Sequence, residues 1–130
     1  MDNQLPVIYI ARHGETAWTI TGQHTGLTDL PLTPQGEKNA QGLADRLKGI
    51  VFAKVLTSPL QRARQTSALA GFASVAEVDG DLVEWNYGEY EGLRSPEIRA
   101  KRRASGKLSR TGDADTGKKT NTFVLCGLFH

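Results

Sequence analysis

The fold of this chain is decided by residues 6–16, PVIYIARHGET. Residues 6–10 are apolar at nearly every position, which predicts a strand buried on both faces, as in a parallel sheet. The strand is followed at once by Arg12, His13 and Gly14. Ligands of open α/β sheets bind just beyond the carboxyl ends of the strands. Arg12 suits phosphate and His13 is a candidate nucleophile, whereas a core strand that ends in a polar turn is the alternative for this stretch alone.

The following segments alternate between helix and strand patterns. Thr33-Pro34 predicts a helix start, and apolar residues at 40, 43, 44 and 47 give that helix one apolar face before Gly49 ends it. Residues 51–56 predict a second strand, and residues 74–78 predict a third. Ser58 and Pro59 predict the N-cap and first position of a second helix, with Gln61 completing a capping box. This order predicts an α/β fold with a parallel sheet.

Two further segments flank these elements. Residues 14–32 form a long polar loop, which in a compact domain is usually functional. Residues 95–103 begin like a helix, and they follow a segment rich in carboxylates and aromatic rings at 82–92.

Composition limits the possible classes of protein. A chain of 130 residues forms one domain at most. Its apolar runs are too short for a membrane helix, and its first residues do not resemble a signal peptide. Cys126 is the only cysteine, so neither an internal disulfide nor a cysteine zinc site is expected. We therefore expect a cytoplasmic protein with no metal, no cofactor and no membrane partner.

Three polar groups follow the three predicted strands. Arg12 and His13 follow the first, Ser58 and Arg62 follow the second, and Glu84 follows the third. The carboxyl ends of parallel strands lie at one sheet edge, so these groups are predicted to converge. Two arginines, a helix start, a histidine and a carboxylate suit phosphoryl transfer, which mainly needs positioning and charge neutralisation.

Four ordered segments resemble the histidine phosphatase superfamily, also called the phosphoglycerate mutase-like family. They are Arg12–Thr16, Gly22–Thr33, Thr57–Thr66 and Glu84–Gly92, within residues 6–100. The second and fourth look most like the small sugar-phosphate phosphatases. The resemblance implies a three-layer α/β fold with a mostly parallel sheet and flanking helices.

The resemblance also implies residue roles. His13 would attack phosphorus and become a phosphohistidine, with its other ring nitrogen donating to a backbone carbonyl. Arg12 and Arg62 would hold the phosphoryl oxygens. Glu84 would act as general acid and then as base. Further substrate-binding or phosphate-binding residues would be Thr19, Thr25, Gly26 and Tyr87. Structural or solvent-exposed roles are expected for Glu15, Glu89, Glu91 and Arg64.

The C-terminal part departs from the family. A second pocket histidine normally lies in a Gly-His pair, and this sequence has none. The resemblance fades near Arg103, and the net charge changes from −4 over residues 1–98 to +6 over residues 99–130. We therefore expect a C-terminally incomplete α/β domain at 1–103 and a basic, disordered or non-family tail at 104–130, through a frameshift or truncation. The apolar run at 123–129 is not expected to enter the sheet.

The predicted function is hydrolysis of a small phosphate monoester, such as a sugar phosphate, through a phosphohistidine, impaired by the missing histidine. Phosphoglycerate mutase-type transfer and a non-catalytic remnant are the alternatives. Nucleic-acid binding by the basic tail is a weaker hypothesis, because no aromatic residues lie between Arg99 and Thr122. The substrate and the oligomeric state are not predictable from the sequence.

Overall fold

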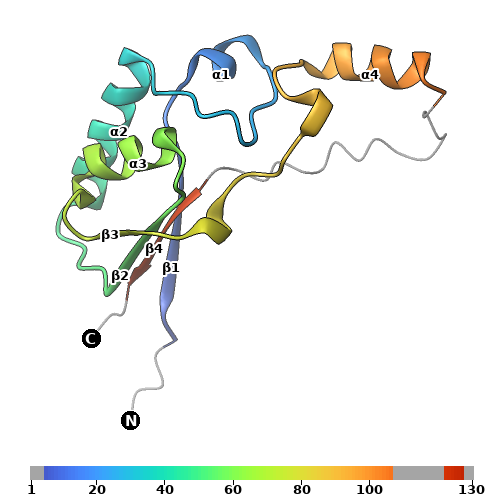
Figure 1. Cartoon of the computed structure of the whole chain (residues 1–130). Helices are drawn as coiled ribbons and strands as arrows, with labels where there is room; N and C mark the ends of the chain where they lie inside the picture. Colours follow the sequence, from blue (N-terminus) through green and yellow to red (C-terminus); the bar gives the residue numbers. More distant parts are fainter. Residues whose placement is uncertain (1–4, 107–121, 128–130) are drawn as a thin grey trace.

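A computed structural model describes residues 5–106 and the backbone of residues 122–127 (Figure 1). The predicted disorder from residue 107 to 121 and the position of His130 lie outside the described residues. The helices and strands are β1 (Val7–Arg12), α1 (Ala17–Thr21), α2 (Pro34–Leu47), β2 (Lys54–Thr57), α3 (Gln61–Ser67), β3 (Ala76–Val78), α4 (Ser95–Ala104) and β4 (Thr122–Gly127). A π-helical turn, Ala68–Phe72, follows α3, and short 3₁₀ turns lie at Gly80–Leu82 and Gly88–Tyr90.

The sheet places three strand ends at one edge. Its order is β1-β4-β2-β3. Strands β2 and β3 pair in parallel, whereas β4 is antiparallel to both β1 and β2. Strands β1, β2 and β3 therefore run in the same direction, and their carboxyl ends share an edge. The predicted α/β class with flanking helices is confirmed, and the antiparallel strand makes the sheet mixed.

Strand β4 corrects one expectation. It lies between β1 and β2, with Val124 opposite both Ile10 and Leu56. The prediction that the C-terminal apolar run would stay out of the sheet is therefore wrong for Thr122–Gly127. The prediction relied on the polar, aperiodic segment that precedes the run. Such a segment does not prevent a distant apolar run from pairing with strands β1 and β2 through its backbone. The proposed domain boundary at residue 103 stays a prediction.

Helices α2 and α3 pack on one face of the sheet (Figure 1). The core on this face is built around Val55 and Ala70, and Tyr9 packs against them. Because side chains alternate along a strand, Ile8 and Ile10 point to the opposite face, where they are 61% and 69% exposed. The described helices therefore leave the far face of β1 open.

The start of α2 fixes the turn that follows β1. Thr33 caps the helix by accepting from Gly36 N at 3.1 Å, and Pro34 occupies the first position, as predicted. A Cβ on Gly14 would lie 2.5 Å from the Gly36 oxygen, and one on Gly36 would lie 2.2 Å from the Glu15 oxygen. Two glycines thus let the backbone after His13 touch the first turn of α2, so the turn has little freedom.

Candidate active site

His13 begins the turn at the carboxyl end of β1, where three hydrogen bonds define its surroundings. Its Nδ1 lies 2.6 Å from the Gly14 carbonyl oxygen. A carbonyl can only accept, so Nδ1 carries the proton and Nε2 keeps the lone pair. The Gly14 N–H donates to the Thr66 hydroxyl at 3.0 Å, and that hydroxyl donates to the Arg62 carbonyl at 2.7 Å. The histidine is thereby held against α3 with Nε2 as the possible nucleophile.

The electrostatic surroundings keep His13 neutral. Burial lowers the pKa of His13 most, the hydrogen bond to Gly14 opposes this, and the charges of Arg62 and Arg12 lower it further. The pKa is about 4, against an ordinary value of 6.5. An imidazole with this pKa is unprotonated at neutral pH, which nucleophilic attack requires.

We expect the His13 Cε1–H resonance to titrate with a midpoint of about pH 4 in the folded protein. The signal is assigned by its loss in His13→Gln. An unfolded histidine titrates near 6.5, so the unfolded chain binds more protons between these two values. His13 therefore contributes stability that is complete above about pH 6.5 and is lost as pH falls towards 4. A native midpoint near 6.5 would contradict the site described here.

Arg62 lies beneath the loop that follows α1. Its side chain is fully buried. Nη1 donates to the Thr28 carbonyl and Nη2 to the Gly26 carbonyl, both at 2.7 Å. Its buried Nε–H has no hydrogen-bond partner among the described residues. The guanidinium is therefore held in place by two neutral carbonyls, with donor capacity left over for a ligand.

The N-terminus of α3 differs from the prediction. The helix begins at Gln61 with Leu60 as N-cap, whereas Ser58 and Pro59 were expected to open it. Ser58 Oγ instead accepts from Leu60 N at 3.3 Å. The free N–H at the helix start is taken by Asp29, whose carboxylate accepts from Gln61 N at 2.7 Å. The first N–H of the helix is thus satisfied within the protein.

Glu84 lies after β3 and the turn Gly80–Leu82, as the predicted convergence requires. Its side chain is buried, and its Oε1 accepts from Trp85 N at 2.9 Å. Burial lowers the pKa of Arg62, while the charges of Glu84, Asp29 and Glu91 raise it. Arg62 therefore interacts electrostatically with both His13 and Glu84.

The other predicted site residues take different positions. Arg12 is exposed at the end of β1, close enough for its charge to act on His13. The Thr19 hydroxyl is used in the capping box of α1, where it accepts from Thr16 N at 2.8 Å and donates to Thr16 O at 2.8 Å. A hydroxyl with both roles filled inside a helix cap does not support the predicted substrate contact.

Three predicted residues lie on the loops beside Arg62. The Thr25 hydroxyl is 3.4 Å from the Gln23 carbonyl oxygen, and Gly26 is buried above Arg62. The Tyr87 ring packs edge-on against His24, with centroids 5.0 Å apart. These contacts join the 22–28 loop to the 84–93 segment.

A cavity of about 560 Å³ lies between β1 and α2. Arg12 and His13 contribute to its lining, and Asn39 and Arg46 of α2 contribute further polar groups. Pockets of this size accommodate small organic ligands. The candidate nucleophile therefore adjoins this cavity, but Arg62 and Glu84 do not line it, so the cavity is not assigned as the substrate site.

Two anchors of the site, Asp29 and Glu91, were not predicted as functional residues. Asp29 joins the loop to α3, and Glu91 accepts from Leu27 N at 3.0 Å and from the Thr28 hydroxyl at 2.8 Å. The residues that Asp29 and Glu91 contact are distant in the sequence, so no periodic or capping pattern marks these two carboxylates.

In the part of the chain that the structure describes, no cluster of three potential metal ligands occurs, and no helix is long and apolar enough to cross a membrane.

Comparisons with known proteins identify the family. Residues 8–122 match the histidine phosphatase superfamily (branch 1), so this chain belongs to that superfamily. An acid phosphatase of Mycobacterium tuberculosis is 46% identical over 95 residues, covering 71% of this chain and 46% of the relative. Sedoheptulose 1,7-bisphosphatase of Saccharomyces cerevisiae is 41% identical over 125 residues, covering 82% and 45%.

Solved structures show the same fold. A phosphoserine phosphatase of Entamoeba histolytica, in complex with 3-phosphoglyceric acid, superposes with a TM-score of 0.67 at 31% identity. The match covers 85% of this chain and 57% of the solved chain. The chain spans about half the length of the curated relatives it matches.

Proposed function

We propose that this chain carries the phosphoryl-accepting site of a phosphatase that hydrolyses small phosphate monoesters through a phosphohistidine at His13. The observation that carries the proposal is the His13 imidazole. Its Nδ1 donates to Gly14 O at 2.6 Å, and its low pKa leaves Nε2 unprotonated. The named relatives are an acid phosphatase, a sedoheptulose bisphosphatase and a phosphoserine phosphatase. The last two names support a small phosphorylated metabolite as substrate.

The proposed reaction has two steps. In the first, His13 Nε2 attacks phosphorus while Arg12 and Arg62 neutralise the phosphoryl oxygens, and Glu84 donates a proton to the leaving oxygen as the P–O bond breaks. In the second, Glu84 as carboxylate takes a proton from water, which attacks phosphorus and releases phosphate and neutral His13. The buried Arg62 Nε–H, which has no partner among the described residues, supports a role as donor to the anion.

The test is hydrolysis of a panel of sugar phosphates by the purified 130-residue chain, measured as phosphate release. Enzymes typically turn over at about 10 s⁻¹, and the absence of one phosphate-stabilising donor costs about 10²–10³ in rate. Because the sequence has no Gly-His pair, we expect a rate lower than the typical value by about that factor, still above His13→Ala.

Chelation and product analysis complete this test. Activity is expected to persist in EDTA, because arginines supply the neutralising charge. Activity lost in EDTA and restored by Mg²⁺ would contradict the mechanism. Phosphate transfer to a second metabolite, without release, would indicate a mutase instead. A chain no faster than His13→Ala would be the non-catalytic remnant.

A further inference from the structure

Behind Arg62 lies a carboxylate that the proposed mechanism does not use. Glu91 Oε1 accepts from Leu27 N at 3.0 Å, and its Oε2 accepts from the Thr28 hydroxyl at 2.8 Å. The carbonyls of Gly26 and Thr28 accept from the Arg62 guanidinium at 2.7 Å. Residues 26–28, which we call the clamp loop, are therefore held by Glu91 on one side and hold Arg62 on the other.

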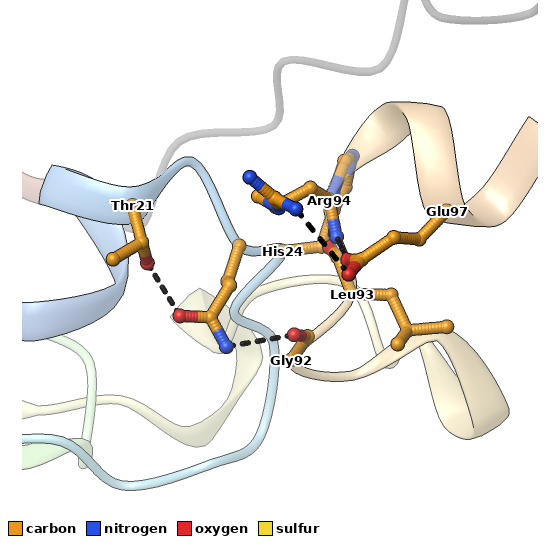
Figure 2. Close-up of polar contacts among 7 residues, drawn as sticks. Thr21, His24, Gly92, Leu93, Arg94 and Glu97 are labelled. Atoms are coloured by element: carbon orange, nitrogen blue, oxygen red, sulfur yellow. Dashed lines mark hydrogen bonds and ion pairs between the residues drawn. The ribbon is translucent and has the colours of Figure 1, made fainter.

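The clamp loop has almost no space in which to shift. A Cβ on Gly26 would lie 2.1 Å from the Trp85 carbonyl oxygen and 2.3 Å from Glu91 Oε1. The residues just before the loop are fixed as well, since Gln23 Nε2 donates to Gly92 O and His24 N donates to Leu93 O, each at 2.8 Å (Figure 2). The 91–93 segment thus supports the whole approach to Arg62.

The charge state of Glu91 fits this role. Burial raises the pKa of Glu91, but hydrogen bonds from the Thr28 hydroxyl and from the backbone of Gly26, Leu27 and Tyr87 outweigh it, so the pKa is below its ordinary value. The carboxylate is therefore ionised at neutral pH and acts only as an acceptor. Its charge also raises the pKa of Arg62.

We propose that Glu91 is a positioning residue, which fixes the clamp loop so that its two carbonyls hold the Arg62 guanidinium in the orientation that binds phosphate. The proposal rests on the proposed function, because the consequence of a fixed Arg62 is anion affinity. Glu91 itself touches no reacting atom. It acts through the clamp loop rather than through an ion pair with Arg62, so the arginine's remaining donors stay available to the ligand.

The test measures vanadate affinity by calorimetry in three variants of the full chain. We expect Glu91→Ala to weaken binding about tenfold or more. Glu91→Gln keeps an acceptor for Leu27 N, and its amide can donate to the Thr28 hydroxyl, so affinity should return to within about threefold of the parent chain. Glu89→Ala is the matched control, because Glu89 is exposed and, among the described residues, pairs with Lys101 at 3.4 Å. The affinity of this variant should stay within about twofold of the parent chain.

A double-mutant cycle separates positioning from general destabilisation. If Glu91 acts through Arg62, Glu91→Ala should change affinity less than about twofold in an Arg62→Lys background, since lysine cannot hold both carbonyls. An undiminished loss in that background would overturn the proposal. So would a Glu91→Gln variant as defective as Glu91→Ala, because charge and not position would then matter. Should Glu91→Ala fail to melt cooperatively, the vanadate affinity of Glu91→Gln decides. An affinity within about threefold of the parent chain supports the proposal, and a larger loss overturns it.

A ligand-free readout keeps this proposal distinct from the proposed function. The Arg62 Nε–H resonance, assigned by its loss in Arg62→Lys, should shift or broaden in Glu91→Ala and stay unchanged in Glu89→Ala. If the parent chain bound no vanadate, the proposed function would fail, while this resonance would still report on Glu91. An unchanged resonance in Glu91→Ala would overturn the positioning role.

Discussion

Arg62→Ala is expected to weaken vanadate or inorganic phosphate binding by about tenfold or more, whereas Arg64→Ala should leave affinity within about twofold. A hydrogen bond to a charged group contributes about 1.5–3 kcal/mol, and each 1.4 kcal/mol is a factor of ten in affinity. Arg62 is buried and its charge acts on His13. Arg64, two positions later on α3, is exposed and lines a different hollow with Gln61 and Ser67.

Folding must be separated from binding in this comparison. Arg62→Ala leaves the carbonyls of Gly26 and Thr28 without their donor, which costs about 1–3 kcal/mol for each unsatisfied group that stays buried. Thermal unfolding is therefore measured for both variants, and Arg62→Lys serves as a variant that keeps the buried cation. Equal losses of affinity in folded Arg62→Ala and Arg64→Ala would contradict the placement of Arg62 in the phosphate pocket.

The parts of the site that lie next to strand ends could be predicted from the sequence. The apolar run at 6–10 predicts a strand, which is present as β1, and its abrupt end fixes where His13 must lie. The predicted burial on both faces is wrong, because Ile8 and Ile10 are 61% and 69% exposed. The predicted backbone acceptor for His13 is present as Gly14 O at 2.6 Å. The convergence of His13, Arg62 and Glu84 follows from codirectional strands, and the electrostatic interactions in the structure agree with it.

The loops could not be predicted in the same way, because their structure depends on distant partners. Asp29 satisfies the start of α3 across 32 residues, which local capping preferences cannot indicate. Glu91 was correctly expected to be structural, yet its partners Leu27 and Thr28 are more than 60 residues away. Helix α1 lies within the predicted loop at 14–32, although its Thr16 and Thr19 capping box is a local signal that sequence reading could have used.

His13→Ala is expected to abolish covalent phosphorylation of the chain. Only His13 combines an unprotonated ring nitrogen with the charges of Arg12 and Arg62, among the residues that the structure describes. His24→Ala is the matched control, because His24 Nδ1 donates to Leu93 O at 3.0 Å and the ring packs on Tyr87, away from this role. The His24→Ala chain should still be phosphorylated, and any change should be confined to its substrate affinity.

The most direct measurement of the central claim is the location of a trapped phosphoryl group. Glu84→Gln should slow the hydrolysis of the intermediate by about 10²–10⁴, so the variant is incubated briefly with a labelled aryl phosphate, whose leaving oxygen departs without the proton that Glu84 would supply. The reaction is quenched in base and the label is mapped by mass spectrometry. We predict an acid-labile, base-stable phosphoryl group on His13, absent when His13→Ala is added. Label on another residue, or label retained in the His13→Ala chain, would contradict the assignment of His13 as the nucleophile.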